Sequence, residues 1–401
     1  MQFEYPKRAL YIVLVLILFA GVPLLALAVG YYLGKQCRGR RAWHSPEAIA
    51  QRVHEWRCAE TLAGCFELHG LPTRGLEECY FGPVHLDRIT RVGPDVPTPF
   101  VGYAPQPGPI ASGFINAQQC RYDRDVEMPK AAKVLRIFLV GGSVAYGAGA
   151  SCNASTIGGY LEQRLQQKVS SMAVDRKIEV IPFAAGAWTT THERIAVEHR
   201  VLDWQPDLVI SLTGHNDAHW AILGYNILWF RGYQDDYYYR LVQSLLAHNF
   251  GRRLSLELQP ERAALSSDSV VRRLLYNVRR THEALSASGV GYLVALQPIL
   301  ACSRKKRTTR ESWMMRRVDE EAFGAHYRTI REALQNYTSR SACPSDSSGV
   351  YFDYVDLTSL FDDVEGEWFI DNCHFGDRGN ERVACALAEK LTTWLRCQVR
   401  R

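Results

Sequence analysis

The feature that most constrains this fold is the run VLRIFLVGGSVAYGAG, residues 134–149, where an apolar segment ends in glycines around one serine. The aliphatic residues up to Val140 are typical of a buried strand, and Gly141 and Gly142 indicate a sharp turn into a helix. Open α/β sheets bind ligands at the carboxyl edge of their strands, so we expect the Ser143 hydroxyl to lie in a functional site. The alternative is a turn that is rich in glycine and serine for structural reasons alone.

Three further segments place a glycine or polar residues at a strand end or in a loop. The runs VIPFAAGAWTTT (180–191) and DLVISLTGHNDAHW (207–220) each predict a strand that ends near a glycine. Near the C-terminus, WFIDNCHFGDRGN (368–380) carries an aspartate and a histidine three positions apart. The positions of interest in these segments are Gly186, Asn216, Asp371 and His374.

These residue types suit acyl transfer. An alcohol nucleophile is weak at its own pKa, and His374 can take the proton from Ser143. Asp371 can orient the other ring nitrogen of that base. Attack on a carbonyl creates an oxyanion, which requires donors that are fixed in advance, such as backbone N–H groups and the side-chain amide of Asn216. Gly186 suits this role because the absence of a Cβ lets a substrate approach the main chain.

A serine, a lone glycine, a Gly-x-Asn-Asp motif and an Asp-x-x-His motif, in this order, resemble the four sequence blocks of the SGNH/GDSL hydrolase family. The resemblance implies Ser143 as the nucleophile, with Asp371 and His374 as the other triad members. It also implies an oxyanion hole formed by the backbone N–H of Ser143, by Gly186 and by Asn216.

The resemblance covers roughly residues 95–401. Within the family, the chain is similar to a membrane-anchored bacterial branch. Two positions depart from the family pattern. Gly142 stands where an aspartate commonly precedes the serine, and Phe375 stands where a proline often follows the histidine. Neither change removes a group that transfers protons.

Charge is concentrated near the N-terminus. Residues 1–41 hold six Lys or Arg and one acidic residue, whereas the rest of the chain has 41 residues of each sign. This neutral body gives no indication of nucleic-acid binding. No charge occurs from Ala9 to Gly34, and such a run at about 1.5 Å per residue spans ~39 Å, enough to cross a bilayer. A cleaved signal peptide with a site near Ala28 is the alternative.

We expect a single N-terminal membrane anchor and an extracytoplasmic catalytic domain. The orientation has a counter-argument, because four basic residues follow the apolar run and only two precede it. Ten of the eleven cysteines lie beyond residue 41, an even number that favours some disulfide bonds in an exported chain. Buried thiols that act as small hydrophobic residues are the alternative.

Three segments are predicted: an N-terminal tail with the anchor or signal peptide (1–34), a stalk and cap containing Cys and Pro (35–130), and the SGNH hydrolase catalytic domain (131–401). In the last, strand-like runs at 134–140, 177–183, 207–213, 290–297 and 350–356 alternate with helix-like runs at 155–170, 189–203, 268–287, 318–336 and 378–396. This alternation predicts an α/β fold, a three-layer α/β/α sandwich with a flavodoxin-like, mostly parallel five-stranded sheet, plus the N-terminal membrane helix.

Two segments are candidates for the substrate rim. Residues 225–239, YNILWFRGYQDDYYY, follow the Asn216 motif and carry aromatic rings with polar tips that suit sugar faces or acyl chains. Residues 303–310, SRKKRTTR, should reach the same sheet edge, although a solvated loop is the plainer interpretation. The rim residues that we expect are Tyr225, Trp229, Phe230, Tyr233, Arg304 and Lys305.

No metal or cofactor is expected. His215, Asp217 and His219 are interpreted as solvated loop residues rather than metal ligands, because the strand ends there and no fixed geometry is implied. The glycines after Val140 lack the lysine that a phosphate-binding loop requires.

The sequence therefore predicts a serine esterase that hydrolyses an O-acyl ester, for example an O-acetyl ester, with a cell-envelope glycan or lipid as the candidate substrate. An acyltransferase would use the same residues and is the nearest alternative. A non-catalytic binding or assembly protein on the same fold is the third interpretation, because a fold does not by itself imply activity.

Overall fold

The computed structural model describes residues 61–90, 95–224, 264–341 and 350–399. Within these ranges, no helix combines the length and the apolar character that crossing a bilayer requires. The predicted membrane segment, 9–34, and the aromatic rim segment, 225–239, lie outside the described residues and stay predictions.

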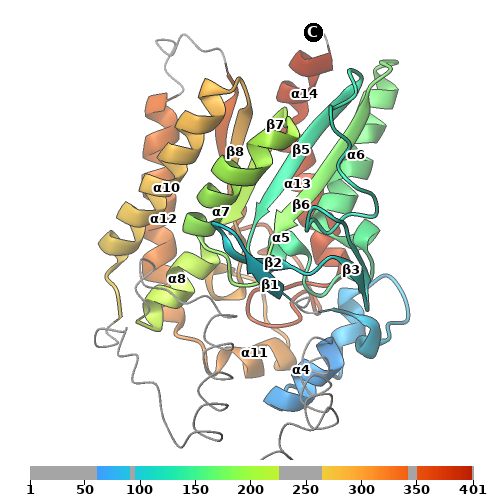
Figure 1. Ribbon diagram of the computed structural model, residues 1–401. Coiled ribbons are helices and arrows are strands. Elements are labelled where there is room, and N and C mark those ends of the chain that lie inside the picture. The colour runs from blue at the N-terminus through green and yellow to red at the C-terminus, as the bar shows by residue number, and fades with distance from the viewer. Residues whose placement is uncertain (1–60, 91–94, 225–263, 342–349, 400–401) are drawn as a thin grey trace, which may run out of the picture. The chain divides into compact units, whose positions relative to one another are not determined.

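A five-stranded parallel sheet forms the centre of the described fold (Figure 1). Its strands lie in the order β6-β5-β7-β8-β9, and all four pairings are parallel. This is the 2-1-3-4-5 order of flavodoxin-like folds, which confirms the predicted sheet. The strands are β5 (Val134–Gly141), β6 (Lys177–Ala184), β7 (Leu208–Thr213), β8 (Gly291–Leu296) and β9 (Phe352–Asp356).

Helices cover both faces of the sheet and give the predicted three layers. In β5, Leu135, Ile137 and Leu139 point into one hydrophobic cluster, and Phe138 and Val140 point into the other. One face carries α6 (Ile157–Ser171), α13 (Asp377–Lys390) and α14 (Thr392–Val399), and the other carries α7 (Thr190–Ala196), α10 (Ser267–Ala287) and α12 (Glu320–Ser341). Because both faces are buried, the strands read as continuous apolar runs rather than as alternating patterns.

Shorter elements lie at the carboxyl edge of the sheet and in the N-terminal part. Two of them follow strands directly, α5 (Ser143–Tyr146) after β5 and α8 (His215–Ile222) after β7. The others are α4 (Leu62–His69), β1 (Asp95–Thr98), β2 (Gly102–Pro105), β3 (Gly108–Ile110), β4 (Gly113–Ile115) and α11 (Thr309–Met315). Single helical turns of other pitch occur at 76–79, 86–88, 153–155, 197–201, 202–204 and 300–302.

The described part of residues 35–130 packs against the sheet domain. Tyr80 donates its hydroxyl hydrogen to the Gly149 carbonyl at 2.9 Å. The buried Arg121 guanidinium donates to the Gly147 carbonyl at 2.6 Å, at the end of the helix that begins with Ser143. This region therefore supports the turn that carries the serine.

The predicted disulfide bonds have no support in the structure. No disulfide joins any two of the cysteines in the described ranges, and several of these thiols are buried in the core. Cys58 and Cys343 lie outside the described residues, so the disulfide hypothesis stays a prediction for them.

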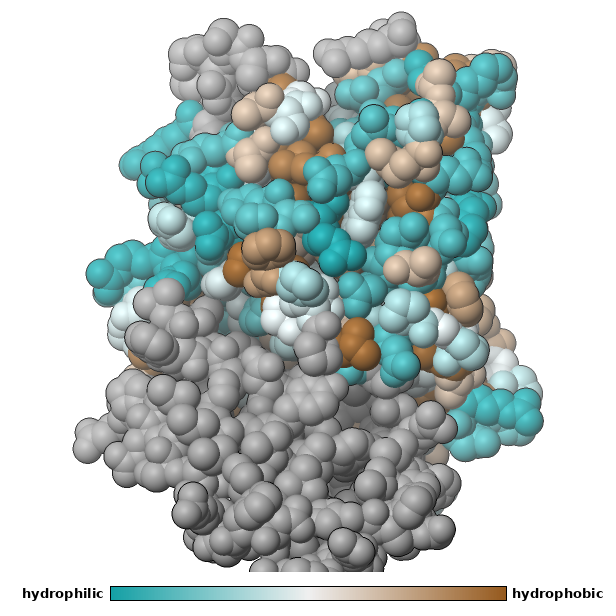
Figure 2. All heavy atoms as spheres, viewed as in Figure 1, coloured by the Kyte–Doolittle hydropathy of each residue, from teal (hydrophilic) through white to brown (hydrophobic). Residues whose placement is uncertain are grey.

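Hydrophilic residues cover most of the described surface on the face shown in Figure 2, with only small hydrophobic groups between them. The exposed large hydrophobic side chains of the described ranges are scattered along the chain: Phe81, Phe100, Phe114, Met128, Leu223 and Tyr276. Scattered exposed residues of this kind are normal for a folded domain.

Candidate active site

Ser143 is the first residue of α5, immediately beyond the carboxyl end of β5. The turn is tight, and a Cβ on Gly141 would lie 2.5 Å from the Leu212 carbonyl oxygen of the neighbouring strand. Close approach between the turn and β7 therefore requires glycine at this position. The Ser143 side chain lies in a buried setting and is only 8% exposed.

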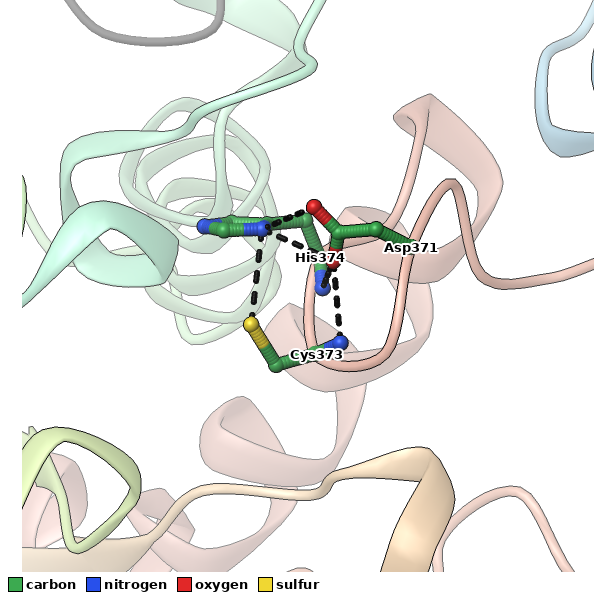
Figure 3. Close-up of side chains that lie close together, drawn as sticks. All are labelled: Asp371, Cys373 and His374. Carbon is green, nitrogen blue, oxygen red and sulfur yellow. Dashed lines mark hydrogen bonds and ion pairs between the residues drawn. The ribbon is translucent and has the colours of Figure 1, made fainter. Parts of the chain in front are cut away.

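His374 connects Ser143 to Asp371. Its Nε2 lies 2.6 Å from Ser143 Oγ, and its Nδ1 lies 2.7 Å from Asp371 Oδ2 and 2.9 Å from Oδ1. Figure 3 shows Asp371 and Cys373 on the Nδ1 side of the ring, with Nε2 pointing away from both. The structure thus brings together the three residues that the sequence predicted as a triad, in hydrogen-bonding order.

The loop that holds Asp371 and His374 is internally bonded. Asp371 Oδ1 accepts the backbone N–H of Cys373 at 3.0 Å and that of His374 at 2.8 Å. Phe375, the residue at the family's common proline position, is buried and stacks on Phe361 with ring centroids 5.3 Å apart. A core aromatic residue therefore anchors the loop where a proline would restrict its backbone.

The predicted oxyanion-hole residues also approach one another. Asn216, on α8, donates its side-chain N–H to the Trp188 carbonyl at 2.7 Å, in the loop that contains Gly186. The same amide nitrogen lies so close to Gly142 that a Cβ there would be 2.2 Å away. Asn216 is therefore placed beside the serine turn.

Tyr103, from β2, holds this loop from the other side. Its hydroxyl donates to the Gly186 carbonyl at 2.7 Å, and its own carbonyl accepts the Trp188 indole N–H at 3.2 Å. The N-terminal hairpin thus fixes the backbone around Gly186. Nothing in the sequence indicates this contact, because no local pattern links Tyr103 to a position 83 residues away.

A buried group of charges, which we call the clamp, holds the backbone just before Asp371. Arg310 donates to the carbonyls of Phe369 at 2.9 Å and Ile370 at 2.5 Å. The carboxylate of Glu311 accepts the backbone N–H of Phe369 at 3.5 Å. The clamp consists of Lys305, Arg310, Glu311 and Glu367.

The clamp changes the interpretation of the basic run 303–310. The side chains of Lys305 and Glu311 have no exposed surface, and their Nζ and Oε2 atoms are 2.6 Å apart. Lys305 therefore lies inside the protein rather than on a substrate rim. Arg304 is exposed, and its backbone N–H donates to Asp362.

The interpretation of His215, Asp217 and His219 as solvated loop residues is wrong, because all three lie on helix α8. Asp217 is buried and accepts the backbone N–H of Thr190 at 3.1 Å and its hydroxyl at 2.6 Å. Burial raises the pKa of the Asp217 carboxyl to about 6. Its role in the structure is to join α8 to α7.

His215 is also buried, and its ring packs against the rings of both His219 and Phe323, at centroid distances of 5.6 and 5.4 Å. Burial, with smaller contributions from the nearby His219 and His374, lowers the pKa of His215 well below its usual value. The ring beside Asn216 is therefore neutral near pH 7. His215, Asp217 and His219 do not form a metal-ligand cluster within the described residues.

Comparisons with known proteins find solved structures that are similar to this chain. No family model and no curated protein matches the sequence. Similar structures include a family 3 carbohydrate esterase of Clostridium thermocellum, at 14% identity and a TM-score of 0.37, covering 67% of this chain and 100% of that one. A lipase/acylhydrolase of Enterococcus faecalis has 15% identity and a TM-score of 0.38, with coverage of 65% and 96%.

A GDSL-like lipase of Bacteroides thetaiotaomicron is similar at 11% identity and a TM-score of 0.35, covering 65% of this chain and 88% of that one. Similarity at this level does not indicate an activity for this chain.

Proposed function

We propose that this chain is a serine esterase that cleaves an O-acyl ester through a covalent acyl-enzyme on Ser143. The observation that carries the proposal is the continuous contact from Ser143 Oγ through both ring nitrogens of His374 to Asp371, at 2.6 and 2.7 Å. A nucleophile, a base and an orienting carboxylate in this order are what an alcohol needs to become reactive.

In the first half of the reaction, His374 Nε2 accepts the Ser143 proton as Oγ attacks the ester carbonyl. Asp371 holds the Nδ1–H and stabilises the imidazolium that forms. The proton on Nε2 then passes to the departing alcohol, and the acyl group stays on Ser143. In the second half, water gives its proton to Nε2 as it attacks the acyl carbonyl. The tetrahedral intermediate then expels Ser143 Oγ, which takes the proton back from Nε2, and the free acid leaves.

The oxyanion of each tetrahedral intermediate needs fixed donors. The Ser143 N–H belongs to the first turn of a helix, where backbone donors have no intrahelical acceptor. The Asn216 amide lies beside the same turn and is oriented by the Trp188 carbonyl. These donors, with the N–H of Gly186, are the oxyanion hole of the proposed mechanism.

Within this proposal, the substrate is an O-acyl ester, with O-acetyl groups on a cell-envelope glycan or lipid as the candidate class. An acyltransferase would form the same acyl-enzyme and differ only in the acceptor. Product analysis separates the two, because hydrolysis releases free acid whereas transfer yields a new ester.

The test is labelling of the purified chain with a fluorophosphonate probe, together with turnover of an aryl acetate. Ser143→Ala should abolish both, and Ser312→Ala, a change at an exposed serine on α11, should leave both unchanged. Circular dichroism should show that both variants fold. Labelling of Ser143→Ala at the wild-type level would refute the proposed nucleophile.

A further inference from the structure

Cys373 is a buried thiol, 3% exposed, that the proposed esterase chemistry does not use. Its Sγ lies 3.4 Å from His374 Nδ1, the nitrogen that faces Asp371 (Figure 3). One ligand atom each from Asp371, Cys373 and His374 lie within 4.8 Å of one another. A sulfur, a nitrogen and an oxygen therefore surround one point beside the proposed base.

We propose that Asp371, Cys373 and His374 form an inhibitory binding site for Zn²⁺ and similar divalent cations. Thiolate, imidazole and carboxylate are the three side-chain ligands that zinc takes in proteins. In a tetrahedral zinc site, bond lengths of 2.0–2.3 Å place neighbouring ligand atoms about 3.3–3.6 Å apart. The 3.4 Å between sulfur and Nδ1 fits this spacing, and the carboxylate at 2.7 Å needs to move outward by about half an ångström.

Charge also favours a cation at this point. A thiolate and a carboxylate together carry two negative charges, so a divalent ion bound to them forms a neutral complex. This matters because the Cys373 and His374 side chains are buried, and burial penalises uncompensated charge. The Asp371 side chain is 13% exposed, so the proposed metal position lies near solvent, and water can be the fourth ligand of the metal.

Binding would block the proposed reaction by changing the tautomer of His374. The Cys373 thiol releases one proton to solvent as its sulfur binds the metal. The Nδ1 proton is replaced by the metal, and the neutral ring carries its proton on Nε2 instead. A protonated Nε2 cannot accept the Ser143 proton, so both turnover and fluorophosphonate labelling should stop. This inhibitory effect rests on the proposed function, whereas metal binding itself does not.

The first test uses Zn²⁺ alone as the inhibitor of the purified chain. Wild-type labelling should fall as Zn²⁺ is added and should return when a chelator removes the metal. With inhibition measured relative to each variant's own zinc-free labelling rate, Cys373→Ala should raise the Zn²⁺ concentration for half-inhibition by at least about tenfold. Cys120→Ala, at another buried cysteine, should behave as wild type. Equal inhibition of Cys373→Ala and wild type would overturn the proposal.

The second test measures binding without activity. Co²⁺ should give a sulfur-to-metal charge-transfer absorption with wild type and with Cys120→Ala, and no such absorption with Cys373→Ala. If the absorption forms in a wild-type protein that has neither esterase activity nor labelling, the metal site stands and the proposed function fails. If an active wild-type enzyme shows neither the absorption nor zinc inhibition, the metal site is refuted and the proposed function stands.

Discussion

The absence of a side chain at Gly142 decides whether the Asn216 amide can lie beside Ser143. A Cβ at this position would lie 2.2 Å from Asn216 Nδ2 and 3.2 Å from the Trp188 carbonyl oxygen. The aspartate that commonly precedes the serine in the resembling family would therefore displace the Asn216 amide here. In this chain the side-chain amide of Asn216 occupies the space beside Gly142.

We predict that Gly142→Ala lowers kcat by on the order of 100- to 1000-fold, the cost of losing one oxyanion donor, with little change in KM. Asn216→Ala should have a similar effect. If Gly142 acts only through Asn216, the double variant should be no worse than Asn216→Ala alone. Kinetics with an aryl acetate measure this, and Gly324→Ala, where a Cβ meets no atom within 4 Å, is the control. Fully additive losses would show that Gly142 acts independently of the amide.

At the scale of elements, the loop from Gly366 to Gly376 is held from outside. The clamp bonds both the N–H and the carbonyl of Phe369, and Arg310 also donates to the Pro72 carbonyl at 2.8 Å. Three chain segments thus meet at one guanidinium. A planar group that bonds several carbonyls in fixed directions cannot be replaced by an ammonium without loss of geometry.

We predict that Arg310→Lys reduces kcat and the fluorophosphonate labelling rate by about 100-fold, because a displacement near 1 Å at the base has this order of effect. The matched control is Arg136→Lys. Arg136 is also buried, pairs with Glu179 at 3.0 Å and donates to the Trp204 carbonyl, but it lies near the opposite end of β5 from Ser143. Both variants should melt at lower temperature, and only Arg310→Lys should lose reactivity. Similar labelling rates in the two would show that the clamp is merely structural.

The elements differ in how far the sequence could predict them. The five strands follow from their apolar runs, and their predicted ends agree with the structure within one or two residues. Helix α8 was missed because its polar residues read as solvated, whereas Asp217 is buried with its carboxylate bonded to Thr190 of α7. The clamp was missed because Arg310 lies in a basic run, while the backbone it holds is about 60 residues away.

At the scale of the whole molecule, buried ionisable groups make stability depend on pH. Burial, together with the nearby Asp217, raises the pKa of Glu193 to about 8. Burial lowers the pKa of His192 to about 4. A raised carboxyl pKa contributes stability below its unfolded value, which is lost as pH rises through the folded value. The lowered pKa of His192 contributes stability above its unfolded value, and this stability is lost as pH falls through the folded value. The free energy of unfolding should therefore be greatest at intermediate pH.

We predict that the melting temperature of the wild type falls between pH 6 and pH 9 and that Glu193→Gln reduces this fall by on the order of several degrees. The neutral amide cannot ionise, so its burial costs the same at every pH in this range. Glu321→Gln, at an exposed residue of α12, is the control. Thermal unfolding followed by circular dichroism measures the difference, and parallel curves for the three proteins would contradict the assignment to Glu193.

The separation of Ser143 and His374 by 231 positions has a consequence for biosynthesis. The strand that carries the serine leaves the ribosome long before the loop that carries its base. Helix α13 follows this loop and binds α6 through the Arg164–Glu381 ion pair, so the base reaches the serine only when the last part of the domain has docked. An alcohol without a base is unreactive. In a nascent or truncated chain, Ser143 would therefore not be activated as a nucleophile. Hydrolytic activity would begin only when the domain is complete.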